Sequence, residues 1–131
     1  MIKELIISIV IVVSIFIGNA VTENYTKESI TETTQSLASL REEIIKDEKD
    51  IDNEVAKKKV YDIYEKWSLR HEKLAYYIEH DELEKVKTEL TELKGYIEKE
   101  EYSNALPDLD KSVYILEHIK DKTALNLKNI F

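Results

Sequence analysis

The feature that most constrains this chain is an uncharged, strongly apolar run from Leu5 to Val21, followed by sequence dense in charge. A helix crosses the hydrocarbon core of a bilayer with about 17–25 such residues, and this run lies at the short end of that range. Ser8 and Ser14 interrupt it, but their hydroxyls can bond back to the helix backbone. We therefore expect residues 1–22 to form a membrane anchor that contacts the lipid bilayer through Leu5–Val21.

The same run has an alternative interpretation as a cleaved signal peptide. Gly18 and Ala20 are small residues at the spacing that a signal peptidase reads, behind a short segment containing Lys3. The run is longer than a typical signal-peptide core of about 7–15 residues, so an uncleaved anchor is favoured. The positive charge is nearly the same on the two sides of the run, with Lys3 before it and Lys27 after it. We expect the short N-terminus to stay inside and the C-terminal domain to lie outside a single-pass cell-membrane anchor. Cleavage after Ala20 would instead give a secreted helical protein.

The remaining residues, 23–131, have the composition of a helical bundle. Charged residues make up 35% of the chain, and only 2 Gly and 1 Pro interrupt it, which favours long helices with short connections. The formal net charge of -8 disfavours nucleic acid and anionic headgroups as primary partners. The absence of cysteine excludes disulfides, thiol catalysis and thiolate metal ligands.

Apolar periodicity predicts an all-α fold in which the transmembrane helix continues into an antiparallel, up-and-down bundle of four helices. The first helix runs from Thr22 to about Lys46, with a thin seam at seven-residue spacing: Ile30, Leu37, Ile44 and Ile51. A turn follows at 46–53, in which Asp52 or Asn53 caps the next helix. The second helix carries the stripe Val60, Tyr64, Trp67, His71, Leu74 and Ile78, with Trp67 at the centre of the core.

The third helix is predicted to start at His80 or Asp81, with the stripe Leu83, Val86, Leu90, Leu93 and Ile97. The fourth runs from about Glu101 to Ile119, with Pro107 near its first turn and an inward stripe of Leu106, Leu109, Val113 and Leu116. The tail is too apolar to remain free, so we expect it to fold back against Ile78 and Leu83: Leu125, Leu127, Ile130 and Phe131. The alternative is a docking peptide for a membrane partner.

Several further segments have a recognisable pattern: Trp67, Tyr77–Leu83, Tyr96-Ile97, Leu116–Ile119 and the terminal Leu127–Phe131. In these segments the chain resembles an uncharacterised bacterial family, domain of unknown function 4363. The resemblance covers nearly the whole chain and is most specific in its C-terminal half, with Pro107 as a local departure. It implies a small membrane-anchored protein of spore-forming Gram-positive bacteria. It implies no catalytic residues.

Two Glu-His dipeptides suggest a metal site, because an up-and-down bundle returns both of them to its membrane-facing end. His80, Glu82, Glu117 and His118 offer the imidazole and carboxylate ligands that suit Zn²⁺ or another divalent ion. No HxxxH or HExxH spacing supports this site. The favoured interpretation gives His80 a helix-junction role and places His118 beside the last helix carbonyls, where a cation is stabilised.

No nucleophile motif and no glycine-rich phosphate loop occurs in the sequence, so we expect no catalytic residues, no cofactor and no small-molecule substrate. The predicted function is a membrane-anchored interaction or scaffold module that docks on a membrane protein or on itself. The alternatives are a divalent-metal-binding or sensing domain and the secreted helical protein.

Overall fold

A computed structural model describes residues 1–130 of the chain, with side chains through residue 125. Four α-helices follow one another, and no strand occurs within the described residues: α1 (Ile2–Ile44), α2 (Asn53–Leu74), α3 (His80–Glu98) and α4 (Tyr102–Ile130). A single 3-10 turn, η1 (Glu48–Asp50), lies between α1 and α2. The all-α prediction is confirmed.

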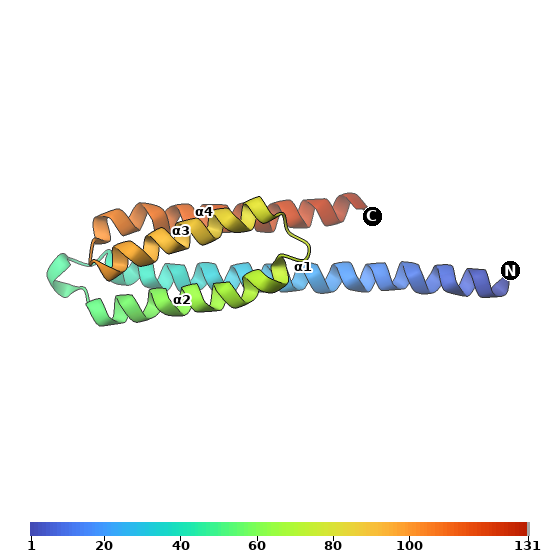
Figure 1. Ribbon diagram of the computed structural model, residues 1–131, viewed down its shortest axis with the longest axis horizontal. Coiled ribbons are helices and arrows are strands. Elements are labelled where there is room, and N and C mark those ends of the chain that lie inside the picture. The colour runs from blue at the N-terminus through green and yellow to red at the C-terminus, as the bar shows by residue number, and fades with distance from the viewer. Residues whose placement is uncertain (131) are drawn as a thin grey trace.

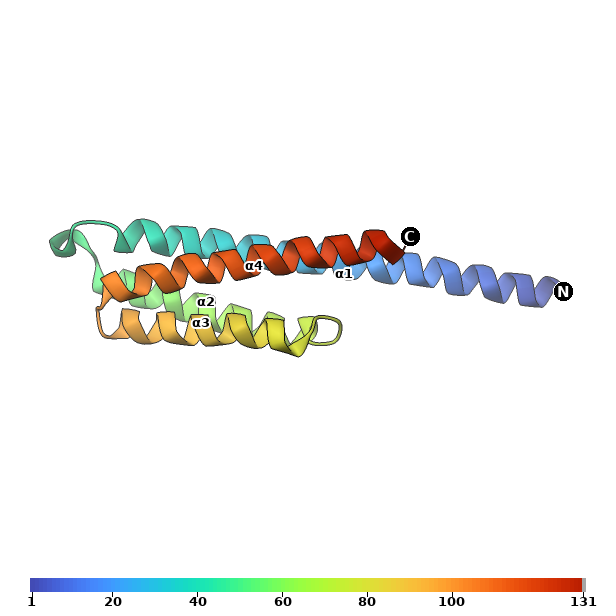
Figure 2. The same ribbon diagram turned by 90° about the horizontal axis from the view of Figure 1, so that it is seen from above.

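The helices form an up-and-down bundle at the C-terminal half of α1, and the N-terminal end of α1 projects beyond the other helices (Figures 1 and 2). Packing follows the order of the chain around the bundle, because α1 contacts α2, α2 contacts α3, α3 contacts α4, and α4 returns to α1. This closed order follows from antiparallel helices that are joined by short turns.

The core is formed by the predicted apolar stripes, except that some of the buried positions on α2 and on α4 differ from the predicted ones. Ile30, Leu37, Ile44 and Ile51 are all buried, and the stripe of α3 is buried from Leu83 to Ile97. On α2 the inward positions are Ala56, Val60, Ile63, Trp67 and Leu74, so Ile63 is buried where Tyr64 and His71 are only half-buried. On α4 they are Tyr102, Ala105, Leu109, Ser112, Leu116 and Ile119, with Leu106 and Val113 at the margin.

The α1–α2 turn matches the prediction and has a specific cap. The Asp52 carboxylate accepts hydrogen bonds from the backbone N–H groups of Glu54 at 3.1 Å and Val55 at 3.2 Å. These two donors have no partner inside the helix, so the side chain determines where α2 begins. Glu43, near the end of α1, accepts from the backbone N–H of Asp52 at 2.8 Å and joins both sides of the turn.

The predicted end of the fourth helix at Ile119 is wrong. α4 begins at Tyr102, places Pro107 inside the helix, and continues to Ile130. No Gly or Pro follows Ile119 to stop it. Of the residues expected to fold back against Ile78 and Leu83, Leu125 is 59% exposed. The side chains of Leu127 and Ile130, and the whole of Phe131, lie outside the described residues.

The α3–α4 turn contains a backbone position that we expect glycine to improve. Glu100 has φ 60, in a Schellman turn where its N–H bonds to Ile97 O at 3.0 Å and the N–H of Glu101 bonds to Tyr96 O at 2.9 Å. A left-handed conformation costs a residue with a Cβ roughly 1–2 kcal/mol. Glu100→Gly should therefore raise the free energy of unfolding by about 0.5–1 kcal/mol in urea titration.

Glu100 also forms an exposed ion pair with Lys57 at 3.2 Å, which glycine would remove. Glu100→Gln removes the charge and keeps the Cβ, so it should leave stability nearly unchanged. A glycine variant no more stable than the glutamine variant would contradict the strain argument.

Candidate functional site

The N-terminal half of α1 has no cover within the described residues. Every position from residue 1 to residue 18 is exposed, and the side chains of this stretch are mostly Ile and Val. By length and composition this helix can cross a membrane, and its apolar window is 0% buried. An apolar surface of this extent requires either lipid or another apolar helix around it.

The bundle is attached to this helix near the end of the apolar run. The Tyr77 hydroxyl, in the α2–α3 turn, lies 2.7 Å from the Thr26 hydroxyl and 3.2 Å from the carbonyl oxygen of Thr22. Burial raises the pKa of the Tyr77 phenol, which therefore stays protonated and able to donate. On α4, Lys122 binds Glu82 of α3 at 2.9 Å.

The four residues of the predicted metal site share this end of the bundle but have separate partners. His80 is exposed and lies 3.7 Å from Glu84, while Glu82 faces Lys122. Glu117 pairs with Lys120 at 3.1 Å on its own helix. His118 is exposed and lines a pocket between α3 and α4 together with Glu82. The arrangement brings His118 near Glu82, whereas the carboxylates already contact lysines.

That pocket is the most apolar feature of this end of the bundle. Its volume is about 220 Å³, and its lining combines an aromatic ring and aliphatic side chains with charged groups: Glu82, Lys85, Tyr114, Ile115, His118 and Ile119. Tyr114 is 73% exposed, although it stands beside buried positions of α4. A hollow with an exposed aromatic residue at its edge has the chemistry of a protein-docking surface.

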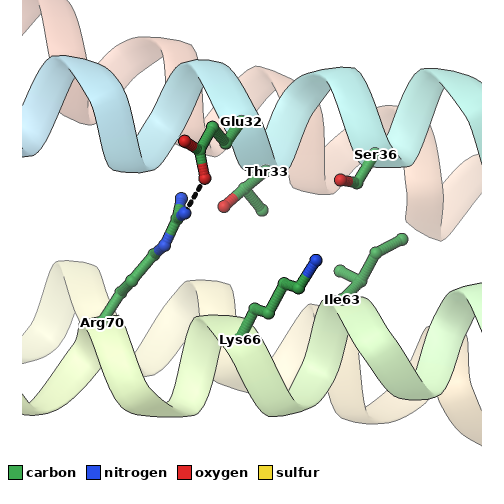
Figure 3. A pocket seen from close by; sticks show the side chains of 6 residues that line it. All are labelled: Glu32, Thr33, Ser36, Ile63, Lys66 and Arg70. Carbon is green, nitrogen blue, oxygen red and sulfur yellow. Dashed lines mark hydrogen bonds and ion pairs between the residues drawn. The ribbon is translucent and has the colours of Figure 1, made fainter.

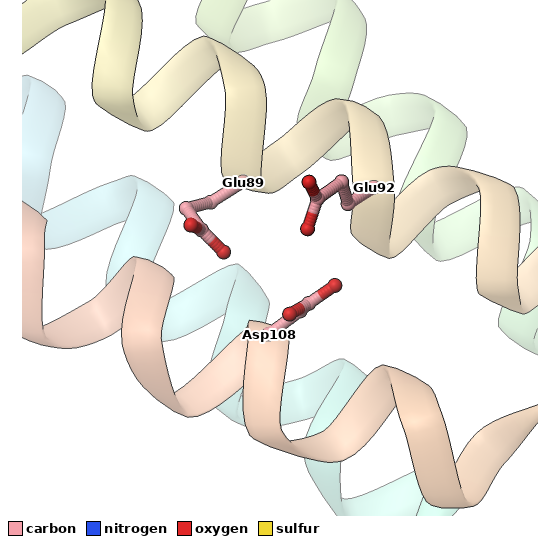
Figure 4. A group of neighbouring side chains, drawn as sticks. All are labelled: Glu89, Glu92 and Asp108. Carbon is pink, nitrogen blue, oxygen red and sulfur yellow. The ribbon is translucent and has the colours of Figure 1, made fainter.

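A carboxylate cluster that the sequence reasoning missed joins α3 to α4 (Figure 4). Oxygens of Glu89, Glu92 and Asp108 lie within 4.8 Å of one another. Glu89 Oε1 pairs with Lys111 at 3.1 Å, whereas Glu89 Oε2 and Asp108 Oδ2 are buried without a hydrogen-bond partner within the described residues. Burial, followed by the negative charges of Glu92 and Glu89, raises the pKa of Asp108.

Carboxylate oxygens at this spacing are ligands that hard divalent cations accept. The chain also offsets part of this negative charge by itself, through the ion pair between Lys111 and Glu89. A sequence signal existed for one member: Glu89 lies three residues after Val86 and four before Leu93, on the apolar stripe of α3. Nothing in the spacing pointed to Asp108, because only packing of α4 on α3 brings it there.

The raised pKa of Asp108 predicts a pH-dependent stability. Folding favours the protonated carboxyl, so this group stabilises the fold most at low pH and loses that contribution as pH rises through its folded pKa. Asp108→Asn carries no charge at any pH. We expect the variant to gain stability over the wild type as pH rises above 3.8, the ordinary value for this carboxyl, by about 1 kcal/mol at neutral pH.

Urea unfolding across pH measures this difference, and Asp110→Asn provides the matched control. Asp110 is exposed and pairs with Arg41 at 2.9 Å, so its neutralisation should cost up to about 1 kcal/mol at neutral pH. If Asp108→Asn lowers the free energy of unfolding at neutral pH, as Asp110→Asn should, the raised pKa of Asp108 would be contradicted.

A polar groove separates α1 from α2 (Figure 3). Arg70 donates to the carbonyl oxygen of Ser29 at 2.7 Å and forms an ion pair with Glu32. Thr33 and Ser36 line the α1 side of the pocket, and Lys66 lines the α2 side. The hollow is only about 30 Å³, so it fits a water molecule better than a ligand. We assign it to the attachment of α2 to α1.

Comparison with known proteins agrees with this architecture. Residues 21–130 match the family model described as domain of unknown function (DUF4363), which begins at the last residue of the apolar run and covers the bundle. No curated protein and no solved structure matches the chain. The chain belongs to the family of domain of unknown function 4363.

Proposed function

We propose that this protein is a single-span membrane protein whose helical bundle is an interaction module, docking on another membrane protein or on a second copy of itself. The observation that carries the proposal is the continuity of α1. One unbroken helix from Ile2 to Ile44 contains both the uncovered apolar half and the buried half of the bundle. A partner that meets the bundle is therefore held at a defined distance and angle from the membrane.

The pocket edged by Tyr114 is the docking surface that we favour within this module. Tyr and Trp are enriched where protein partners contact each other, because one ring buries much area at small entropic cost. Tyr114 is exposed above Ile115 and Ile119, which are partly or fully buried in the same stretch of α4. With 73% of its surface exposed, Tyr114 is accessible to a partner.

The test is photo-crosslinking in native membranes from a photoreactive amino acid that replaces Tyr114. We expect a discrete adduct from this position, with twice the mass of the chain if the partner is a second copy. The control is the same amino acid at Glu48, an exposed position in η1. Equal labelling from Glu48 and Tyr114, or no adduct from a folded and membrane-bound Tyr114 variant, would contradict docking at this surface.

We also propose an orientation of the chain in the membrane, with the N-terminus inside and the bundle outside the cell. The chain contains 0 Cys, so one introduced cysteine is labelled without background. Glu48→Cys should react with a membrane-impermeant maleimide on intact cells, and Lys3→Cys should react only after lysis. Reversed labelling would place the bundle inside. If mass spectrometry of the intact protein gives the mass of a chain that begins at Val21, the cleaved, secreted alternative holds.

The divalent-cation alternative stays a prediction, with two places to test. Calorimetric titration with Zn²⁺ examines the His80–His118 end, and titration with Mg²⁺ or Ca²⁺ examines the carboxylate cluster. Saturable heat that His118→Ala removes would support the first, and saturable heat that Glu92→Gln removes would support the second. Either result would move the proposal from an interaction module to a cation-dependent one.

A further inference from the structure

We propose that the turn between α2 and α3, with Tyr76 at its most exposed point, lies in the headgroup layer of the same bilayer that holds α1. The bundle then touches the membrane at a second place, and α1 is not a flexible tether. This inference rests on the proposed single-span anchor.

The height of the turn above the membrane follows from its hydrogen bonds to α1. Tyr77 contacts the Thr26 hydroxyl and the Thr22 carbonyl oxygen, and Thr22 is the residue directly after Val21. At about 1.5 Å per residue, Thr22 to Thr26 lie within about 8 Å of the end of the apolar run. The headgroup layer is about 5–7 Å thick on each side of the hydrocarbon. The turn is therefore held at the level of the headgroups.

The side chains at this level have interfacial chemistry. Tyr76 is 89% exposed and stands next to Tyr77 in the turn. Tyr25, on α1 between Thr22 and Thr26, receives Lys73 Nζ at 5.6 Å from its ring centre. Tyrosine is enriched at membrane–water interfaces because its ring is apolar and its hydroxyl remains hydrated, and lysine can extend its ammonium group toward the headgroups.

The charges around the turn favour a neutral lipid surface. The turn is followed by Glu79, His80 and Asp81, while Lys73 and Lys122 are the neighbouring cations, the latter already paired with Glu79 and Glu82. Anionic headgroups would be repelled by the carboxylates of this turn, of which Asp81 has no ion-pair partner within the described residues. We therefore infer a contact driven by the tyrosine ring with zwitterionic lipid, which salt should affect little.

The C-terminal part of α4 also lies near the level of the α2–α3 turn. Lys120 and Ala124 line a hollow with Glu23 and Thr26 of α1, so α4 reaches the height of the turn near Ala124. The helix then continues to Ile130 beside the apolar half of α1, past the α2–α3 turn (Figures 1 and 2). The α2–α3 turn and the part of α4 near Ala124 thus both lie close to the level at which the apolar run ends.

Depth measurement by electron paramagnetic resonance tests the inference on the full chain in phosphatidylcholine nanodiscs. Single nitroxide labels are placed at Tyr76→Cys, at Glu48→Cys at the far end of the bundle, and at Gly18→Cys. An added Cβ at Gly18 meets nothing within 4 Å, so the label fits there. Collisions with oxygen and with a polar nickel chelate report the depth of each label.

We expect the oxygen-to-nickel ratio at Tyr76 to be several-fold above that at Glu48 and below that at Gly18. A Tyr76 ratio equal to the Glu48 ratio, with Gly18 reading as membrane-embedded, would overturn the second contact and leave the anchor intact. A Gly18 ratio equal to the Glu48 ratio would instead overturn the anchor itself. The two failures are therefore distinguishable.

A second measurement keeps the label away from the tyrosine. With the nitroxide at His80→Cys, we expect Tyr76→Ser to lower the oxygen-to-nickel ratio, because the ring that contacts lipid is lost. Tyr61→Ser, which removes an exposed tyrosine from the half of α2 far from the turn, should leave that ratio unchanged. If Tyr76→Ser leaves the oxygen-to-nickel ratio unchanged, Tyr76 does not hold the turn in the headgroup layer.

Discussion

Trp67→Ala is expected to destabilise the bundle by about 3–5 kcal/mol, the range found when a large buried aromatic side chain is truncated. Trp67 is 2% exposed and lies on α2 between Ile63 and Leu74, which are also buried. Removing the indole opens a cavity that neighbouring helices can fill only by moving. The measurement is urea unfolding of the full chain in a mild detergent, followed by circular dichroism.

Two control variants separate packing from other effects. Leu69→Ala, on the same helix and 68% exposed, should change stability by less than about 0.5 kcal/mol. Trp67→Phe keeps most of the buried ring and removes an indole N–H that has no hydrogen-bond partner within the described residues. An unsatisfied buried donor costs about 1–3 kcal/mol, so the phenylalanine variant should lose far less stability than the alanine variant. Equal losses in the two variants would contradict this explanation.

Val12→Arg is expected to cost roughly 2.5–3.5 kcal/mol of insertion free energy, since a charged side chain would stand near the middle of the span. Val12 is 50% exposed and lies in the apolar run Leu5–Val21, which itself contains no acidic residue that could neutralise an arginine. Each 1.4 kcal/mol is about a tenfold change in an equilibrium, and the membrane-bound fraction should fall accordingly.

Alkaline carbonate extraction measures that fraction, with Val12→Leu as the control that preserves the apolar surface. The wild type and the leucine variant should remain in the pellet, and the arginine variant should shift toward the supernatant. Release of the wild type by carbonate would exclude an integral anchor, and it would direct attention to an apolar protein partner that covers the run.

Much of the architecture could be predicted from periodicity because each helix buries one side. The heptad-spaced residues of α1 and the stripe of α3 are in the core, and Asp52 caps α2 as its position before an apolar stripe suggests. The errors occurred where periodicity is ambiguous. Ile63 follows Val60 by three residues and Tyr64 follows it by four, so both continue an apolar helical pattern, and only contact with the neighbouring helices distinguishes them.

The candidate sites were less predictable than the fold. Separation along the chain does not reveal that Asp108 meets Glu89 and Glu92, because that contact depends on how α4 is placed along α3. The same placement brings Lys122 to Glu82, one of the four residues of the alternative metal site. The apparent end of the fourth helix at Ile119 reflected a loss of apolar pattern, whereas the backbone continues wherever no residue stops it.

The sequence by itself determined the helical class, the apolar run of α1, the turn at Asp52 and the burial of Trp67, because these depend on local propensity and on the period of the apolar residues. Only the tertiary structure decided which side chains from different helices meet. Tyr77 reaches Thr26, and Asp108 joins Glu89, because of the axial placement of packed helices, which no local rule contains. That placement also puts the α2–α3 turn beside Thr22, at the level where the apolar run ends.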